Sequence, residues 1–368
     1  MSVNVLPETQ SALLVHGPRQ RYELASIPLP TLRSDDEVLV RIEAIGLNPV
    51  DWKSVAFNFA LPVLPALNGR DLAGTIVATG NRVNRFKAGD RVFARRKTLT
   101  SLVERPDRDY RTSSFQQYAV ASEHCLGLVP ANVSIEESAA LGVGASTAAI
   151  ALSSTLGIRI RNFASSELNS GSEGELDPSL IPPPIAKGDW LLIWGASCVT
   201  GYFAAQFARL AGLRVVAVAC EKKHGERLRA IGVEKVIDRH DPLLAVSQVV
   251  ELTSNQLKYA LDCVGSETAG FAQQALRTQG DSYLVGLSGL PKILRDGVNG
   301  RSVPIKTFHT NHQVGFNLMK LIEDLLISGE LVLPTVTVLE GGLAAVNAGL
   351  EQLRTGQVSF GRIVVKVA

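Results

Sequence analysis

The stretch LLIWGASCVTGYFAAQFARLAG (191–212) decides how this chain is interpreted. It runs from a short apolar segment through a glycine-spaced turn, GASCVTG (195–201), into an alanine-rich segment with helical periodicity. A turn that ends a strand and opens a helix offers backbone N–H groups and the positive end of the helix dipole to a pyrophosphate. The spacing departs from G-x-G-x-x-G, because Ser197 stands in place of the middle glycine.

The segments that follow this stretch alternate between strand and helix patterns. Helical periodicity at segments such as 203–212 and 271–280 separates short apolar runs. Strands are predicted at 190–195, 213–220, 235–238, 258–265 and 282–289. Strands that are linked through helices form a parallel sheet with right-handed crossovers, so we predict a doubly wound Rossmann sheet. The glycine-spaced turn lies at its first strand-to-helix junction, where a dinucleotide would bind.

Within the turn, each residue type has a physical reason to be there. Gly195 permits the tight bend, and Gly201 allows the helix to approach the strand closely. The hydroxyl groups of Ser197 and Thr200 can donate to phosphate oxygens. The predicted pyrophosphate-binding residues are Gly195, Ser197, Cys198, Val199 and Thr200.

The corner after the second predicted strand decides which nicotinamide cofactor is expected. Glu221 could bind a ribose 2′-hydroxyl and repel a 2′-phosphate, which favours NADH. The basic residues around it would neutralise a 2′-phosphate and favour NADPH, unless they are only a solvated surface. We predict NADPH. The residues predicted to bind this end of the cofactor are Glu221, Lys222, Lys223, His224, Arg229 and Arg239.

The first 150 residues have the pattern of a β-rich domain, in which short strands alternate with turns. Strands are predicted at 37–47, 72–80 and 89–95. A helical pattern follows at 135–156, and a Ser-, Gly-, Glu- and Pro-rich segment at 162–189 indicates an exposed loop at a domain border. Near the end of the chain, we predict an amphipathic helix at 316–331 and, at 361–367, a strand that returns to the first domain.

Composition narrows the class of protein. The chain has 368 residues, 46% of them hydrophobic, with a formal net charge of +2, which fits a globular protein and shows no bias toward nucleic acid. We expect no membrane span and no signal peptide, and therefore a cytoplasmic protein. The four cysteines are widely spaced, so they indicate reduced thiols and neither a zinc ribbon nor a disulfide framework.

Taken together, these features resemble the medium-chain dehydrogenase/reductase superfamily. The resemblance implies an α/β chain with a GroES-like catalytic domain at 1–155, completed by 330–368, and a Rossmann NADPH-binding domain at 156–329. The zinc-dependent branch has a Cys within the segment that corresponds to 46–53 and a His where this chain has Arg70. This chain has neither residue, so it resembles the zinc-free branch, and no metal is expected.

Within that branch, NPVDWK (48–53) and GRDLAG (69–74) are similar to quinone reductases. With GVGASTA (142–148) and ALDC (260–263), they more closely resemble the trans-acting enoyl reductases of fungal polyketide biosynthesis. The resemblance implies hydride transfer from NADPH to the α,β-unsaturated thioester of a polyketide on the carrier protein of a synthase. An NADPH-dependent quinone or small-enone reductase is one alternative, and a non-catalytic NADPH-binding partner subunit is another.

The resemblance also implies site residues. Lys53 is the first candidate for binding the cofactor or steering a proton, and its alternative is an ordinary surface lysine. Thr147 would place a hydroxyl at a helix start near the nicotinamide ribose or the substrate carbonyl, and its alternative is a helix N-cap. Arg362 is the C-terminal residue best suited to a phosphate. The remaining cofactor contacts implied by the family are Val50, Asp51, Trp52, Gly286, Leu287, Ser359 and Phe360.

Two features concern partners. Carrier proteins are usually acidic, so the basic residues at 95–111 are a candidate docking surface, with a plain solvated loop as the alternative. Members of the superfamily often dimerise through the last Rossmann strand, here near 283–289, so the chain is expected to be a monomer or a homodimer.

Overall fold

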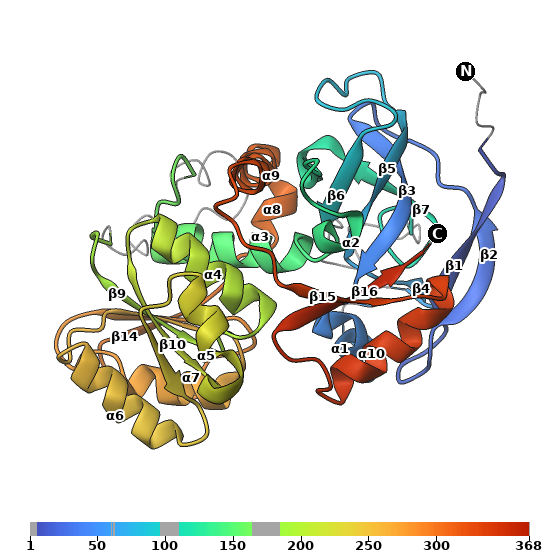
Figure 1. Cartoon of the computed structure of the whole chain (residues 1–368). Coiled ribbons are helices and arrows are strands. Elements are labelled where there is room, and N and C mark those ends of the chain that lie inside the picture. The colour runs from blue at the N-terminus through green and yellow to red at the C-terminus, as the bar shows by residue number, and fades with distance from the viewer. Residues whose placement is uncertain (1–5, 60, 62, 96–109, 164–184, 368) are drawn as a thin grey trace. The chain divides into compact units, whose positions relative to one another are not determined.

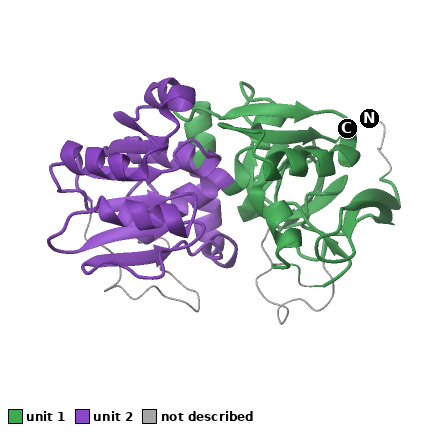
Figure 2. Ribbon diagram, turned by 90° about the horizontal axis from the view of Figure 1, so that it is seen from below, with its two compact units in different colours: residues 1–143, 322–368 green, residues 144–321 purple. Residues whose placement is uncertain are grey.

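The structure, a computed structural model, describes residues 6–59, 61, 63–95, 110–163 and 185–367. It divides into two compact units, shown in Figure 2. The first unit contains residues 1–143 and 322–368, and the second contains 144–321. These divisions lie after Val143 and Leu321, whereas the predicted domain boundaries lie after residues 155 and 329.

Two β-sheets form the framework of the first unit (Figure 1). The smaller sheet has the order β2-β1-β4, and the larger has the order β15-β16-β3-β5-β6-β8, with β7 also paired to β3. The strands of the smaller sheet are β1 Thr9–Val15, β2 Glu23–Pro28 and β4 Ala66–Leu67. Those of the larger sheet are β3 Glu37–Gly46, β5 Asp71–Thr79, β6 Arg91–Arg95, β7 Tyr118–Ser122, β8 Leu126–Leu128, β15 Thr335–Leu339 and β16 Gly361–Lys366.

Strand β3 is central to this sheet because it pairs with three other strands, β5, β7 and β16. Most of its residues are therefore buried, and the strand confirms the one predicted at 37–47. The pairing of β16 with β3 is antiparallel, with Val364 opposite Gly46, which confirms the predicted return of the chain end. Around the sheets lie α1 Pro49–Ala56, α2 Ile135–Ser138, α10 Val346–Arg354 and the 3₁₀ turns Glu123–Cys125 and Gly342–Ala345.

The second unit contains a six-stranded parallel sheet in the order β11-β10-β9-β12-β13-β14. Five of its strands confirm the predicted ones, and β14 was not predicted. The strands are β9 Trp190–Trp194, β10 Arg214–Ala219, β11 Lys235–Asp238, β12 Tyr259–Asp262, β13 Ser282–Gly286 and β14 Val298–Ser302. The helices are α4 Val199–Leu210, α5 Glu221–Ala230, α6 Pro242–Leu252, α7 Ser266–Gln274 and α8 Thr307–Thr310.

The strand order reverses direction between β11 and β12. The chain moves outward from β9 to β10 and β11, then crosses back to β12 on the other side of β9. Because such crossovers are right-handed, α4 and α5 cover one face of the sheet, and α6 and α7 cover the other (Figure 1). On the second face, alanines such as Ala245, Ala269 and Ala272 pack against the sheet residues Leu192 and Val216.

Two helical regions cross the division between the units. The predicted helix at 135–156 forms α2, α3 Gly142–Ile150 and a π-helical turn, Ala151–Thr155. Within the described ranges, Ile135–Thr155 is long and apolar enough to span a membrane, which differs from the expectation that the chain has no such run. However, 89% of its apolar window is buried, so its composition is that of a core helix. The other region is α9 His312–Ile327, which confirms the amphipathic helix predicted near 316–331.

Candidate functional site

The turn after β9 is held in one geometry by its own backbone. Gly195 has a positive φ of 83°, and a Cβ atom there would lie 2.5 Å from Cγ2 of Val264. The N–H of Cys198 donates to the carbonyl of Gly195 at 3.0 Å. Cys198 is also the N-cap of α4, because its Sγ accepts a hydrogen bond from the N–H of Gly201 at 3.3 Å. Thiol sulfur thus takes the role that a hydroxyl oxygen usually has at this position.

Helix α4 approaches this turn closely at Gly201. A Cβ atom on Gly201 would lie 2.8 Å from Cα of Ala196 and 2.8 Å from the carbonyl oxygen of Gly195. Both of these are backbone atoms, which cannot rotate away. The first turn of α4 can therefore lie over the end of β9 only because residue 201 has no side chain. Ser197, Val199 and Thr200 are partly exposed beside it.

The turn lies at the point where the sheet order reverses, which is where open α/β sheets bind their ligands. β9 has β10 on one side and β12 on the other, and Cys263, the residue after β12, donates from its N–H to the carbonyl of Trp194 at 2.9 Å. Leu287, after β13, likewise donates to the carbonyl of Asp262 at 2.9 Å. The structure therefore brings the predicted residues Gly286 and Leu287 to the same sheet edge as the turn.

Two thiols meet at this edge. The side chains of Cys198 and Cys263 are hydrogen-bonded to each other, and this bond, with burial, raises the pKa of the Cys263 thiol well above its ordinary value. Cys263 is therefore a neutral thiol at physiological pH. Its neutrality suits an edge that is expected to receive a phosphate.

At the corner after β10, the acidic residue is already paired. The Glu221 carboxylate forms an ion pair with the Arg229 guanidinium, two turns further along α5, and both side chains are about half exposed. The N–H of Glu221 donates to Oδ2 of Asp238 at 3.0 Å. Since its charge is compensated, Glu221 is a weaker obstacle to a 2′-phosphate than its sequence position suggests.

Basic residues surround His224 at the same corner. His224 is buried, and its pKa is lowered first by burial and then by the nearby charges of Lys223, Arg227 and Arg239. The structure therefore brings together two of the predicted cations, Lys223 and Arg239, with Arg227, which sequence reasoning missed. Lys222 is exposed at the start of α5. A positively charged corner of this kind suits a phosphate group.

Three possible metal-ligating atoms also lie at this corner. Cys220, Asp238 and His240 offer one ligand atom each within 4.8 Å of one another. However, Asp238 accepts hydrogen bonds from the backbone N–H of His240 at 2.9 Å and from Glu221, and it contacts His240 Nδ1 at 2.6 Å. These hydrogen bonds account for the grouping, and they lower the pKa of Asp238. We assign no metal to it.

In the first unit, the predicted residues Val50, Asp51, Trp52 and Lys53 all lie on α1. The helix begins after Asn48, whose N–H donates to Asp51 Oδ2 at 2.8 Å. Asp51 is fully buried, and its Oδ1 lies 2.6 Å from Nη1 of Arg70. The side chain of Asp51 therefore fixes the start of α1 and pairs with Arg70, and it is not free to contact a cofactor, which corrects the prediction for this residue.

Arg70 lies at the position where zinc-dependent members of the medium-chain dehydrogenase/reductase superfamily, which this chain resembles, have a histidine ligand. Its guanidinium is buried and carries donors only, so it cannot coordinate a metal ion. It is held by Asp51 and by Oδ1 of Asn68 at 3.3 Å. Arg70 therefore forms an internal ion pair and does not serve as a metal ligand.

The prediction that Arg362 binds a phosphate is wrong. It is buried, and its Nη1 donates to the carbonyl of Leu47 at 3.1 Å and to Oδ1 of Asn48 at 2.5 Å. Its Nη2 lies 3.5 Å from Oδ2 of Asp71. Burial nevertheless raises the pKa of Asp71 to about 6, against the effects of Arg362 and Asn48. Because Arg362 is buried and its Nη1 and Nη2 atoms are directed to these internal partners, it is not available to a phosphate.

The two predicted catalytic residues have different settings. Lys53 is partly exposed, and its Nζ lies 5.8 Å from the centroid of the Trp52 ring. Thr147 is also partly exposed, but α3 begins at Gly142, so Thr147 lies in the helix interior. The expectation of a hydroxyl at a helix start, and of an N-cap as its alternative, is therefore wrong.

Two further predictions change with the structure. Arg95 and Arg111 are buried, and Nη1 of Arg111 lies 2.8 Å from Oε2 of Glu37, so neither contributes to a docking surface. The other predicted docking residues, at 96–109, lie outside the described residues, as does most of the loop at 162–189. Near the chain end, Ser359 is exposed, whereas Phe360 is buried with a positive φ of 61°.

Comparisons with known proteins agree with this geometry. Residues 34–131 match the alcohol dehydrogenase GroES-like domain, and residues 200–320 match the zinc-binding dehydrogenase family. The chain is 31% identical to the trans-enoyl reductase caaB of Aspergillus niger over 99% of its own length and 98% of that protein. It is 29% identical to the enoyl reductase component lovC of the lovastatin nonaketide synthase of Aspergillus terreus, over 98% and 97% of the two chains.

Solved structures share the fold. The crystal structure of the CurK enoyl reductase superposes with a TM-score of 0.75 at 16% identity, covering 98% of this chain and 99% of that one. A quinone oxidoreductase from Pseudomonas syringae pv. tomato superposes with a TM-score of 0.74 at 20% identity, covering 97% and 99%. At these identities, the likeness concerns the fold alone.

Proposed function

This chain belongs to the medium-chain dehydrogenase/reductase superfamily and, within it, to the trans-enoyl reductases, and from this premise we propose the reaction, cofactor and partner. The reaction is reduction of the α,β-unsaturated thioester of a polyketide intermediate. The intermediate is carried on the acyl carrier protein of a polyketide synthase that lacks this activity. The observation that carries the proposal is the full-length similarity to trans-enoyl reductases, together with a phosphate-accepting turn at the reversal of the sheet order.

The proposed cofactor is NADPH. The turn at Gly195 and the N-terminus of α4 would receive the pyrophosphate. Lys223, Arg227 and Arg239 would receive the 2′-phosphate, and the pairing of Glu221 with Arg229 removes the charge that argues for NADH. Bound NADPH supplies the hydride. We place the enzyme in the cytoplasm, where NADPH and a synthase would be available.

The proposed chemistry needs two actions from the protein's side chains. When the hydride adds to the β-carbon, negative charge develops on the thioester carbonyl oxygen, and the α-carbon then takes up a proton. The ammonium of Lys53 or the hydroxyl of Thr147 would stabilise that oxygen or direct the proton. Asp51 and Arg70 act as positioning residues, because they fix the start of the helix that carries Lys53.

The test is oxidation of NADPH by the full chain with crotonyl and longer enoyl thioesters, beside a panel of quinones, with NADH as the cofactor control. We expect turnover of thioesters with NADPH and a loss of about a hundredfold or more in kcat for Lys53→Ala. Lys87→Ala removes an exposed lysine from the same unit and is the matched control. Turnover of quinones alone would support a quinone reductase, and cofactor binding without turnover would support a non-catalytic partner subunit.

The cofactor assignment has its own test. Arg239→Glu reverses one exposed charge near His224, so we expect about a tenfold weaker affinity for NADPH. NADH has no 2′-phosphate, and its affinity should change far less. Equal changes for both cofactors would contradict the assignment of this corner to the 2′-phosphate.

A further inference from the structure

Asp71 is a buried carboxylate whose two oxygen atoms both meet donors from other parts of the first unit. It lies at the start of β5 and is fully buried. Its Oδ1 accepts a hydrogen bond at 2.8 Å from the N–H of Val143, in the first turn of α3. Its Oδ2 accepts at 3.0 Å from Nδ2 of Asn48, the residue before α1, and lies 3.5 Å from Nη2 of Arg362 on β16. One carboxylate therefore joins the starts of two helices and the strand that returns at the chain end.

Two glycines allow the backbone to approach Asp71 closely. A Cβ atom on Gly142, the first residue of α3, would lie 2.4 Å from Asp71 Oδ1. Gly46 lies opposite Asp71 on β3, and a Cβ atom there would lie 3.2 Å from the Cβ of Asp71. The side chain of Asp71 is therefore enclosed by backbone, and it cannot turn to other partners unless a strand or a helix moves.

The charges around Asp71 leave its carboxyl group able to titrate near neutral pH. Among the described residues, the charged side chains that act on it are Arg362 on β16, Asp51 on α1 and Arg95 on β6, whereas β3 and α3 present backbone. Burial raises the pKa of Asp71 to about 6; Arg362 and the amide of Asn48 oppose the rise, and Asp51 adds to it. Burial also lowers the pKa of Arg95 to about 10, and Asp71 opposes that change.

The hydrogen bonds of this site suit the ionised form of Asp71. A protonated carboxyl group carries an O–H on one of its oxygens. On Oδ2 the proton would displace one of the donors of Asn48 and Arg362, and on Oδ1 it would meet the N–H of Val143 where Gly142 restricts the space. A neutral carboxyl group is also a weaker acceptor than a carboxylate for all three donors. Protonation therefore weakens the attachment of Asn48.

That attachment bears on Lys53, because Asn48 directly precedes α1 and Lys53 lies on this helix. The side chain of Asn48 is held from two sides: its Nδ2 donates to Asp71, and its Oδ1 accepts from Nη1 of Arg362 at 2.5 Å. The N–H of Asn48 donates to Asp51 within the first turn of α1. A change in the charge of Asp71 thus reaches α1 through the residue on which the helix begins.

We propose that Asp71 is a positioning residue for the enoyl reduction, and that only its ionised form holds α1, and with it Lys53, in the orientation that acts on the thioester. The inference rests on the proposed function and adds a residue that is assigned no contact with substrate or cofactor. As the pH falls through about 6, Asp71 takes up a proton and kcat falls. Asp71→Asn keeps the size of the side chain and is neutral at every pH, so at neutral pH it should behave as the unsubstituted enzyme does in acid.

The first measurement is kcat for a crotonyl thioester at saturating NADPH, between about pH 5 and pH 8. For the unsubstituted enzyme, kcat should fall about tenfold or more as the pH drops through about 6. Asp71→Asn should have the low rate already at neutral pH, without that fall. Asp35→Asn makes the same substitution at an exposed carboxylate of the first unit and should keep both the rate and the fall. An Asp71→Asn enzyme with the unsubstituted rate and pH profile would overturn the proposal.

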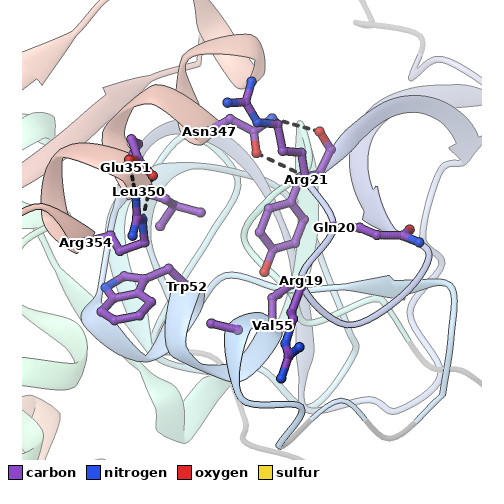
Figure 3. A pocket seen from close by; sticks show the side chains of 11 residues that line it. Arg19, Gln20, Arg21, Trp52, Val55, Asn347, Leu350, Glu351 and Arg354 are labelled. Carbon is purple, nitrogen blue, oxygen red and sulfur yellow. Dashed lines mark hydrogen bonds and ion pairs between the residues drawn. The ribbon is translucent and has the colours of Figure 1, made fainter.

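The second measurement follows α1 and needs no substrate. Trp52, the neighbour of Lys53, lines a pocket of about 240 Å³ together with Leu350 and Arg354 of α10 (Figure 3), so its fluorescence should respond when α1 moves. Comparison with Trp52→Phe separates this signal from that of the other tryptophans. The signal should titrate with a midpoint near pH 6, and Asp71→Asn should abolish the titration. Asn48→Ala breaks the link but leaves Asp71 in place, and it should abolish the titration as well.

The two measurements separate this proposal from the proposed function. If no thioester is reduced but Trp52 titrates only when Asp71 is present, the reaction is refuted and the link between Asp71 and α1 stands. If thioesters are reduced and neither kcat nor the Trp52 signal depends on Asp71, only the positioning role is refuted. Should Asp71→Asn fail to fold, the unsubstituted enzyme and Asn48→Ala decide: equal titrations in these two would overturn the proposal.

Discussion

Replacing Gly201 with alanine tests, with one added carbon atom, the turn that is proposed to bind the pyrophosphate. The added Cβ would lie 2.8 Å from Cα of Ala196 and 2.8 Å from the carbonyl oxygen of Gly195. Real Cβ atoms essentially never approach other atoms that closely, so α4 must move away from the end of β9. The movement would displace the N–H groups at the start of α4, which are the ones proposed to hold the pyrophosphate.

The expected change in the dissociation constant for NADPH follows from the free-energy cost of overpacking. Inserting a methyl group against fixed backbone costs about 1–3 kcal/mol. Alanine recovers about 1 kcal/mol of helix propensity, but it does so with and without cofactor. If the overpacking cost falls on the bound geometry, the dissociation constant for NADPH rises about 5- to 150-fold.

Gly270→Ala is the matched control, because Gly270 is also a helical glycine of the second unit and a Cβ there would meet nothing within 4 Å. This variant should bind NADPH normally and unfold at a higher temperature. The assay is a fluorescence titration with NADPH, with thermal unfolding as the check on folding. A Gly201→Ala protein that is folded and binds NADPH as tightly as the Gly270→Ala protein would refute the assignment of this turn.

Two further predictions concern charges in the folded state. Arg70→Met leaves the buried Asp51 carboxylate without its cation and should lower the free energy of unfolding in urea by about 3–5 kcal/mol; Arg82→Ala, from an exposed pair, should cost less than about 1 kcal/mol, and equal losses would contradict the argument. His224 has a pKa below its ordinary 6.5, so the unfolded state takes up the proton first and stability should fall as pH drops below 6.5. His224→Gln should flatten that slope in unfolding curves measured across pH, and a stability that rises on acidification only when His224 is present would contradict the sign.

Some features of this protein follow from local sequence. The strands and helices of the second unit were predictable because their apolar periodicities differ, and the Gly195 turn because its residues are consecutive. The sixth strand, β14, was missed because VNGRS is short, polar and contains a glycine. It is a strand only because β13 offers it a free edge.

The pairing of charged residues could not be found in this way. Sequence shows that Asp51, Arg70 and Arg362 are charged, but it does not show whether they face solvent. Arg362 meets Asn48 from 314 positions away, and this contact removes it from the candidate phosphate ligands. For the same reason the basic residues Arg95 and Arg111 were taken for surface, whereas the strands that surround them bury them.

The sequence by itself determined the alternation of strands and helices in the second unit and the glycine-spaced turn, because each of these depends on residues that are near neighbours in the chain. The tertiary structure alone decided which charges are spent inside the protein and which remain for ligands. Arg70 and Arg362 are paired with the buried Asp51 and Asp71, whereas Arg227 and Arg239 are exposed near His224. Burial and pairing are properties of space, and an ion pair between residues hundreds of positions apart leaves no periodic signal in a sequence.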